Sequence, residues 1–257
     1  MFKIPLLNCF IATLYLICTL SCSSNSNETP TPAGGTLSGS VQLWDDKLTT
    51  STDNSGVTIT VNDLTNTSAT TDAAGKYTFA TLPYGLHDFT VSKAGYGSYK
   101  LFGVSHNSAS ISSSSISGTV VPAIQFGKLS TTSITSLSVS GNTYNGNPGV
   151  SVLYSVSPTP TSVNRGYARY FLSTDQGVSN TNYKYASPIV SVLNNNVTGG
   201  FTKDDLLTAG FKSGQPVYLR LYGESVQSNT YTDPNIGIQA FPNLNLTTPS
   251  AVSFVMP

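Results

Sequence analysis

The chain has 257 residues, and its twelve lysines and arginines are balanced by twelve acidic residues. Charged residues make up 9% of the sequence, against roughly 25% in an average soluble protein. A neutral chain without basic or acidic runs has no long-range attraction for nucleic acid, which excludes a nucleic-acid-binding function. The length leaves room for two domains of about 100 residues, each large enough to bury a core without disulfides or metal ions.

The first 21 residues have the composition of an export signal. Lys3 precedes an apolar stretch at residues 6–20, which is shorter than the roughly 20 apolar residues of a membrane-spanning helix. We therefore expect a signal peptide at residues 1–21. The stretch ends in Thr-Leu-Ser-Cys at residues 19–22, which resembles a lipobox, the motif that precedes a lipidated cysteine. Ser21 fits this pattern, while the leucine lies one place later than usual.

This motif predicts that Cys22 is lipidated after cleavage; the alternative is ordinary cleavage near Ser21, and both export the protein. Residues 22–35 are mostly Ser, Asn, Thr, Pro and Gly, a composition that cannot bury apolar surface and predicts a disordered tether. Acyl chains on Cys22 would hold the protein on a membrane, since each buried CH₂ contributes about 0.8 kcal/mol. We expect an exported lipoprotein of the outer membrane that faces the periplasm or the cell surface. All three cysteines lie in the first 22 residues, so no disulfide is expected in the body of the protein.

Residues 36–127 show the alternation of apolar and polar residues that is typical of half-buried strands. Four segments carry it most clearly: 37–43, 57–61, 77–79 and 89–92. Strands this closely spaced, with turn-forming residues and no amphipathic helix between them, predict a β-sandwich. We expect Gly75 to take a positive φ at a hairpin corner and Asp72 to accept hydrogen bonds within its turn. The Ser-rich residues 107–117 predict a loop or a weak edge strand, and residues 120–126 would close the sandwich.

Four stretches of this unit, taken in order, resemble the carboxypeptidase regulatory-like domain, which has a transthyretin-like sandwich. They are residues 55–61, 71–79, 82–91 and 93–96, and the resemblance covers about residues 37–104. His87 stands where that family more often has Tyr. The resemblance implies a seven-strand sandwich related to starch-binding folds and an accessory role, not peptidase activity. A catalytic zinc ion needs about three protein ligands, whereas His87 and His106 are the only histidines.

Several side chains of this unit have two alternative roles. Four acids lie among its turns: Asp45, Asp46, Asp53 and Asp72. They suit turn chemistry, and their scattered positions lack the dense spacing of a calcium loop, so we expect no metal site. Gly95 and Tyr96 are expected to turn the chain and pack a ring over the edge of the sandwich. The alternative for Tyr96 and Tyr99 is stacking against a ligand.

Residues 128–257 are expected to form a second sandwich of the immunoglobulin-like or fibronectin-like kind, although the Cys–Trp–Cys signature is missing. The expected strands are 134–139, 150–156, 169–172, 189–193 and 217–222, and the expected loops are 141–148 and 194–200. One short helix is predicted, because Thr202 and Asp205 have the spacing of a capping box. The two leucines that follow would both face the core, and Gly210 would end the helix.

In the last of these strands the aliphatic side chains occupy one face, and Tyr218, Arg220 and Tyr222 share the other. Flat rings beside a guanidinium suit a sugar or the surface of a partner protein. The alternative is an ordinary exposed strand face, or one that a loop covers. With Tyr96 and Tyr99, these three residues are the candidate ligand-binding residues of the chain.

No catalytic group is predicted. A serine nucleophile needs a base held beside it, and neither histidine lies near a nucleophile elbow. The acids mostly suit turns and helix caps rather than the paired carboxylates of a glycosidase. The sequence therefore predicts a non-enzymatic protein without a cofactor. Two functions remain: a surface binding or adhesion module for a ligand such as polysaccharide, or a structural spacer or accessory subunit of an envelope protein complex.

Overall fold

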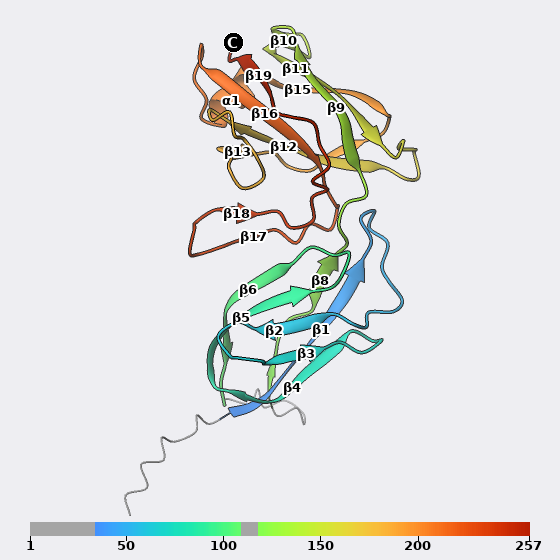
Figure 1. Cartoon of the computed structure of the whole chain (residues 1–257), viewed down its shortest axis with the longest axis vertical. Helices are drawn as coiled ribbons and strands as arrows, with labels where there is room; N and C mark the ends of the chain where they lie inside the picture. Colours follow the sequence, from blue (N-terminus) through green and yellow to red (C-terminus); the bar gives the residue numbers. More distant parts are fainter. Residues whose placement is uncertain (1–33, 109–117) are drawn as a thin grey trace, which may run out of the picture. The chain divides into compact units, whose positions relative to one another are not determined.

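The computed structural model describes residues 34–108 and 118–257 (Figure 1). These residues form nineteen strands and one short helix, which confirms the predicted all-β sandwich class. The signal peptide, Cys22, the tether up to residue 33 and most of the Ser-rich stretch 107–117 lie outside the described residues. Within the described ranges no helix is long and apolar enough to span a membrane.

Two sheets make up the described chain as far as residue 127. One contains β1 (Gly34–Trp44), β4 (Lys76–Pro83), β7 (Thr119–Val120) and β8 (Ile124–Gly127); the other contains β2 (Thr58–Val61), β3 (Ser68–Thr70), β5 (Gly85–Ser92) and β6 (Tyr99–His106). β1 pairs antiparallel with β4 and parallel with β7 and β8, and the second sheet is antiparallel in the order β3-β2-β5-β6. β6 pairs with β5 and β8 pairs with β1, so each keeps one edge without a strand partner in the described chain.

The apolar positions of these strands form the core between the two sheets. Ile59 in β2 is fully buried and Phe89 in β5 is 2% exposed, because alternate residues of a strand point to the same face. The predicted turn chemistry is confirmed at the corner before β4. Gly75 has a φ of +78°, and Asp72 Oδ1 accepts a hydrogen bond from the Lys76 N–H at 2.9 Å.

The remaining strands form a second pair of sheets and one separate hairpin. One sheet contains β9 (Ser133–Ser140), β10 (Thr143–Tyr144), β11 (Asn147–Ser157) and β15 (Asn196–Thr202); the other contains β12 (Gly166–Ser173), β13 (Tyr185–Ala186), β14 (Val190–Val192), β16 (Pro216–Gly223) and β19 (Val252–Val255). The hairpin is β17 (Tyr231–Thr232) with β18 (Gln239–Ala240). Apolar residues from both sheets, among them Val152, Tyr170 and Leu219, form a core of their own.

The predicted capping box is present on α1 (Lys203–Thr208). The Thr202 side chain accepts from the Asp205 N–H, and the Asp205 side chain accepts from the Thr202 N–H. Gly210 follows the helix with a φ of +86°, as expected for a residue that ends a helix. Leu206 is fully buried, but Leu207 is 46% exposed, so the prediction that both face the core is wrong. Neighbouring residues of a helix point about 100° apart, and the short helix α1 presents only one of the two leucines to the core.

The predicted loop at residues 194–200 is wrong, because most of this stretch belongs to β15. β15 pairs with β11 over seven residues. Its two glycines suggest a loop by composition, but they lie where rings cross the strand. A Cβ at Gly199 would collide with the Tyr170 hydroxyl, and one at Gly200 would lie 2.5 Å from Cδ2 of Tyr144. These glycines make room for tyrosine rings on a strand.

Two other boundaries differ from the prediction. The stretch 141–148, expected to be a loop, contains β10 and the start of β11. Asn145 and Gly146 join them with φ values of 51° and 77°, which is the positive-φ turn that a two-residue hairpin needs. Gly34 and Gly35, which the composition places in the tether, pair with the end of β4. The two glycines pair with β4 through main-chain groups only, so no side-chain pattern in the sequence predicts this pairing.

Hydrogen bonds join the two sandwiches beside the end of β8. Asn243 is fully buried; its Nδ2 donates to the Gly127 C=O at 2.6 Å, and its Oδ1 accepts from the Asn229 N–H at 2.7 Å. Asp46 Oδ2 accepts from Thr131 Oγ1 at 2.6 Å. All the described residues belong to one compact unit. The proposed domain boundary between residues 127 and 128 stays a prediction.

Candidate functional site

The predicted binding face of β16 is partly covered. Tyr222 is 3% exposed, and its ring meets the Phe171 ring edge-on at 5.5 Å between centroids. Phe241 and Leu244 belong to the same hydrophobic cluster, so later residues of the chain cover this part of the face. Burial raises the pKa of the Tyr222 hydroxyl above its ordinary value. Covering by a loop, one of the two alternatives for this strand, therefore describes the surroundings of Tyr222.

Tyr218 and Arg220 lie on the same face and are half-buried. The Arg220 guanidinium lies 5.4 Å from the centre of the Tyr222 ring, so a cation–π contact within the protein occupies one side of it. Tyr218 packs against the cluster that contains Tyr222. The three residues do share one strand face, as the alternation predicts, and their role in ligand binding stays a prediction.

The other two candidate tyrosines have different surroundings. Tyr96 stacks on Phe126 at 5.4 Å with an interplanar angle of 21°, after Gly95 turns the chain with a φ of +80°. This confirms that Tyr96 packs over the edge of the sandwich. Tyr99 lies at the start of β6 and lines an open cavity of about 410 Å³. Tyr99 is therefore the predicted residue that the structure places at a cavity large enough for a ligand.

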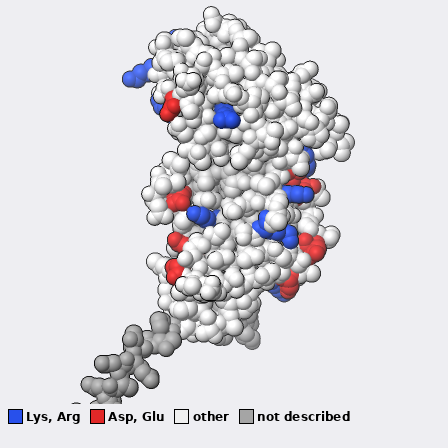
Figure 2. Space-filling view, viewed as in Figure 1, with Lys and Arg blue, Asp and Glu red and all other residues white. Residues whose placement is uncertain are grey.

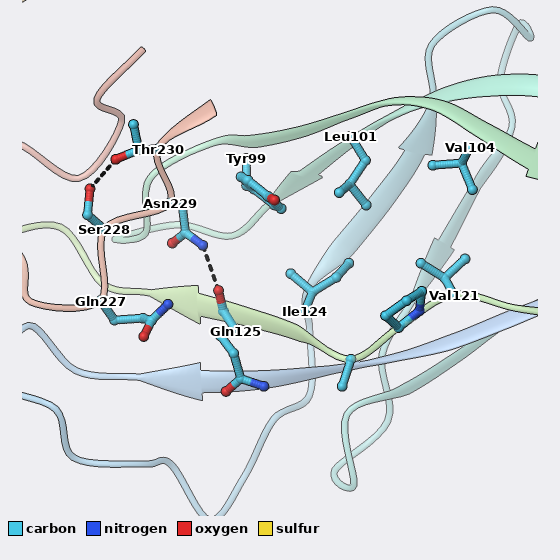
Figure 3. Close-up of a pocket in the computed structure, with 12 residues that line it drawn as sticks. Tyr99, Leu101, Val104, Val121, Ile124, Gln125, Gln227, Ser228, Asn229 and Thr230 are labelled. Carbon is cyan, nitrogen blue, oxygen red and sulfur yellow. Dashed lines mark hydrogen bonds between the residues drawn. The ribbon is translucent and has the colours of Figure 1, made fainter. Parts of the chain in front are cut away.

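This cavity is a groove between the free edges of β6 and β8, and we call it the β6–β8 groove (Figure 3). Its two walls differ in chemistry. The apolar wall consists mainly of Tyr99, Leu101, Val104, Val121 and Ile124. The polar wall consists of Gln125, Gln227, Ser228, Asn229 and Thr230. The groove therefore offers a ligand one apolar side and one side of amide and hydroxyl groups.

None of the residues that line the groove is charged. The nearest ion pair on β6 joins Lys100 Nζ to Asp233 Oδ2 at 3.6 Å, so these two charges satisfy each other outside the groove. Charged side chains are also few, and of mixed sign, on the face of the molecule shown in Figure 2. A buried charge is costly without a partner of opposite sign. The lining therefore favours a neutral ligand.

The polar wall is ordered by hydrogen bonds within the protein. Ser228 Oγ lies 2.7 Å from Thr230 Oγ1, and Gln125 Oε1 accepts from Trp44 Nε1 at 2.6 Å. Asn229 is 4% exposed and bonds to the main chain of β8 through both atoms of its amide. These bonds fix the wall in the absence of a ligand, which lowers the entropy lost on binding.

The two histidines lie close together in the first sandwich, with ring centroids 6.5 Å apart, and protein groups contact every ring nitrogen. His87 Nδ1 lies 2.8 Å from Asp63 Oδ2 and its Nε2 lies 2.8 Å from the Pro83 C=O. His106 bonds in the same way to Thr119 and to a β4 carbonyl. Burial raises the pKa of Asp63, but hydrogen bonds from His87 and from main-chain N–H groups outweigh it and leave this pKa below its ordinary value. Both histidines thus serve packing within the sandwich.

The acids that could have formed a calcium site lie in turns and a junction instead. Asp45 Oδ1 accepts from the N–H groups of Lys47 and Thr49. Asp53 Oδ1 accepts from the Ser55 N–H, and this bond is the main reason that its pKa lies below the ordinary value. Across residues 34–108 and 118–257, no three His, Cys, Asp or Glu side chains gather closely enough to hold a metal ion.

Sequence reasoning missed the polar wall of the groove. Gln125 and Asn229 are 104 positions apart and come from different sandwiches. Neither lies in a motif, and residues 224–230 show no alternation that would predict their position. The only signal in the sequence was Tyr99 as a candidate ring for stacking against a ligand, and no pattern placed it on a strand or at a sheet edge.

No family model matches the chain, and no curated protein is similar enough to count as a relative. Among solved structures, it is similar to a "putative carbohydrate binding protein" from Bacteroides uniformis, with 12% identity over 88% of this chain and 100% of that chain, at a TM-score of 0.30. A DUF3823 family protein from Parabacteroides merdae is 11% identical over 87% and 100%, at a TM-score of 0.29. A mutant type II cohesin-X-dockerin complex from Acetivibrio cellulolyticus is 23% identical over 38% of this chain, at a TM-score of 0.30. The chain spans 60% of the length of that last protein.

Together, the fold and the groove define an all-β protein of sandwich architecture with an uncharged, two-sided cavity at a sheet edge.

Proposed function

We propose that this protein is a non-catalytic binding module of the cell envelope that holds a neutral carbohydrate in the β6–β8 groove. The observation that carries the proposal is the groove lining, which is apolar on one side, rich in amides and hydroxyls on the other, and free of charge. A sugar ring has the matching chemistry, because its C–H groups form apolar faces and its hydroxyl groups lie around the rim.

The dimensions of the groove support the same conclusion. Its volume of about 410 Å³ falls within the roughly 300–1,000 Å³ of small-molecule sites. Tyr99 offers a flat ring for the C–H face of a sugar, as aromatic residues commonly do at wet sites. Gln227 offers both donors and an acceptor in its side-chain amide, and a neutral hydroxyl group can satisfy either.

The location in the envelope rests on the leader. The signal-like residues 1–21 and the lipobox-like motif that ends at Cys22 support an exported protein on a lipid anchor in the outer membrane. Mass spectrometry of the mature protein tests this. We expect an N-terminal Cys22 that carries acyl chains, loss of membrane association on Cys22→Ser, and no change on Cys18→Ser. A mature protein without acyl chains would contradict the anchor.

The first sandwich is proposed to be a carboxypeptidase regulatory-like domain with an accessory role. The four motifs in order support this, together with the turn residues Gly75 and Asp72 that close the hairpin before β4. An accessory domain of this kind supplies binding or support rather than chemistry, which agrees with the absence of a predicted catalytic group.

Calorimetric titration tests the ligand class. Protein without the leader would be titrated with linear neutral oligosaccharides of glucose, mannose, galactose and xylose, and with acidic oligosaccharides of uronic acids. We expect micromolar binding of a neutral oligosaccharide and a loss of about tenfold on Tyr99→Ala. Tyr218→Ala is the matched control, since Tyr218 is a half-buried tyrosine on the other candidate surface.

Three outcomes would overturn the proposal. Binding that depends on Tyr218 and not on Tyr99 would move the site to the face of β16. A preference for acidic sugars would contradict the neutral lining. If no oligosaccharide binds and a fixed envelope protein co-purifies with the chain, the protein is the accessory subunit or spacer that the sequence leaves as the alternative.

A further inference from the structure

On the edge of β8 that borders the groove, the side chain of Asn229 makes the hydrogen bonds that a neighbouring strand would otherwise make. Asn229 Oδ1 accepts from the Gly127 N–H at 2.6 Å. Asn229 Nδ2 donates to the Gln125 C=O, also at 2.6 Å, and this second bond is drawn in Figure 3. In a parallel sheet, one residue of a neighbouring strand makes this same pair of bonds, to an N–H and a C=O two residues apart. The amide of Asn229 therefore replaces one residue of a missing strand.

This arrangement fixes the direction of a further main-chain group, the N–H of Gln125. The N–H and C=O of one strand residue point to the same side, and successive residues alternate between the two sides. Because the Gln125 C=O meets Asn229, the Gln125 N–H also points away from β1 and toward the groove edge. The ladder between β1 and β8 uses the main-chain groups of Ile124 and Phe126. Neither the ladder nor Asn229 uses the Gln125 N–H.

We propose that the Gln125 N–H is the main-chain donor that fixes one hydroxyl group of the sugar in the groove, an inference that rests on the function proposed above. A hydroxyl group accepts from this N–H and still has its own proton to donate. Gln227 lines the same wall, and its side-chain amide contains an oxygen that can accept that proton. The ring carbons of the same sugar then lie against Tyr99 and the aliphatic wall.

An added peptide strand fits this edge less well. Strand addition needs a row of free N–H and C=O groups along the edge. Asn229 already occupies the next two groups, the Gln125 C=O and the Gly127 N–H, and Asn243 occupies the Gly127 C=O. Within β8, the Gln125 N–H is then the one donor left on this edge, and a single donor suits one hydroxyl group.

Amide hydrogen exchange of the wild-type protein tests the proposal without any substitution. The oligosaccharide would be the neutral one that binds best in the calorimetric panel. We expect the Gln125 N–H to exchange rapidly in the free protein and at least about tenfold more slowly in the complex. The Gly127 N–H, which bonds to Asn229 in both states, is the internal reference and should be slow throughout. Unchanged exchange at Gln125 in a saturated complex would overturn the proposal.

Two substitutions at one position separate main-chain from side-chain binding. Gln125→Pro removes the N–H, and proline is tolerated on a strand edge where that N–H makes no ladder bond. Gln125→Ala removes the side-chain amide and keeps the N–H. We expect about a tenfold loss of affinity for Q125P and less than about a threefold loss for Q125A.

An equal loss in both variants, or wild-type affinity in a folded Q125P protein, would overturn the proposal. If Q125P does not fold, the exchange experiment decides. Absence of any oligosaccharide binding to the wild-type protein would be a failure of the proposed function instead, so the two failures are distinguishable.

Discussion

Tyr99 on β6 and Tyr222 on β16 are both aromatic residues on well-formed strands, and their surroundings differ. Tyr99 borders an open groove, whereas Tyr222 is 3% exposed within a hydrophobic cluster. The chain that follows β16 causes both results. Residues 227–230 form a wall of the groove, and Phe241 of the same segment packs in the cluster with Tyr222. A tyrosine on a sheet is therefore open to a ligand where the following segment of the chain lies beside it, and is closed to a ligand where that segment packs over it.

The largest expected effect is a loss of stability on breaking the buried ion pair that packs against Phe241, in the segment that follows β16. Arg169 Nε donates to Glu224 Oε2 at 3.0 Å, with 11% and 0% of the two side chains exposed, and the guanidinium lies 4.6 Å from the centre of the Phe241 ring. Burial raises the pKa of Glu224 even though Arg169 opposes this. Arg169→Met should cost about 3–5 kcal/mol in the free energy of unfolding, because it leaves a buried carboxylate unpaired.

Urea denaturation measures this loss. The double variant Arg169→Met with Glu224→Leu is the control, and it should recover most of the stability because no buried charge remains. Equal destabilisation in the single and double variants would show that the ion pair is not what matters at this position.

The second prediction sharpens the comparison of the two tyrosines. Tyr222→Ala removes a buried ring and should cost about 3 kcal/mol of stability with little change in ligand affinity of the folded protein. Tyr99→Ala should do the reverse, with less than about 1 kcal/mol lost in stability and a clear loss of affinity. Thermal unfolding and calorimetric titration of both variants provide the test. The distinction fails if Tyr222→Ala is as stable as the wild type.

The third prediction concerns pH. Burial raises the pKa of Tyr77, in the core of the first sandwich, to about 12 from an ordinary value of 10.0. Between these values the folded state binds the phenol proton more tightly than the unfolded state does, so stability is full below pH 10 and falls as the pH rises toward 12. Two pKa units correspond to about 2–3 kcal/mol. Tyr77→Phe should flatten this part of the alkaline stability profile in urea titrations; an unchanged slope would contradict the assignment.

The smallest effect tests the side chain that ties the groove to the second sandwich. Asn229→Ala leaves the Gly127 N–H and the Gln125 C=O without their partner, which should cost about 2 kcal/mol. Asn235→Ala, in an exposed turn, should change stability by less than about 0.5 kcal/mol. Denaturant unfolding compares the two, and equal effects would show that the amide of Asn229 does not stabilise the edge of β8.

Local patterns predicted the helix and the strands that alternate most clearly, because these signals lie within a few residues. The capping box at Thr202 and the alternation in β2 are examples, and both appear in the structure. Composition predicted a loop wrongly where a glycine makes room for a side chain that is distant in sequence. Gly199 is an example, because a Cβ there would collide with the Tyr170 hydroxyl. The groove was beyond reach for a related reason, since it depends on which strand edges remain free and on contacts such as that of Asn229 with Gln125.

A titration of the uniformly ¹⁵N-labelled protein with the neutral oligosaccharide panel locates the binding surface residue by residue. We expect main-chain signals of Tyr99, Gln125 and residues 227–230 to shift together with one dissociation constant, while those of Tyr218 and Arg220 stay in place. Shifts confined to the face of β16, or a response to uronic acid oligosaccharides and none to neutral ones, would contradict this expectation.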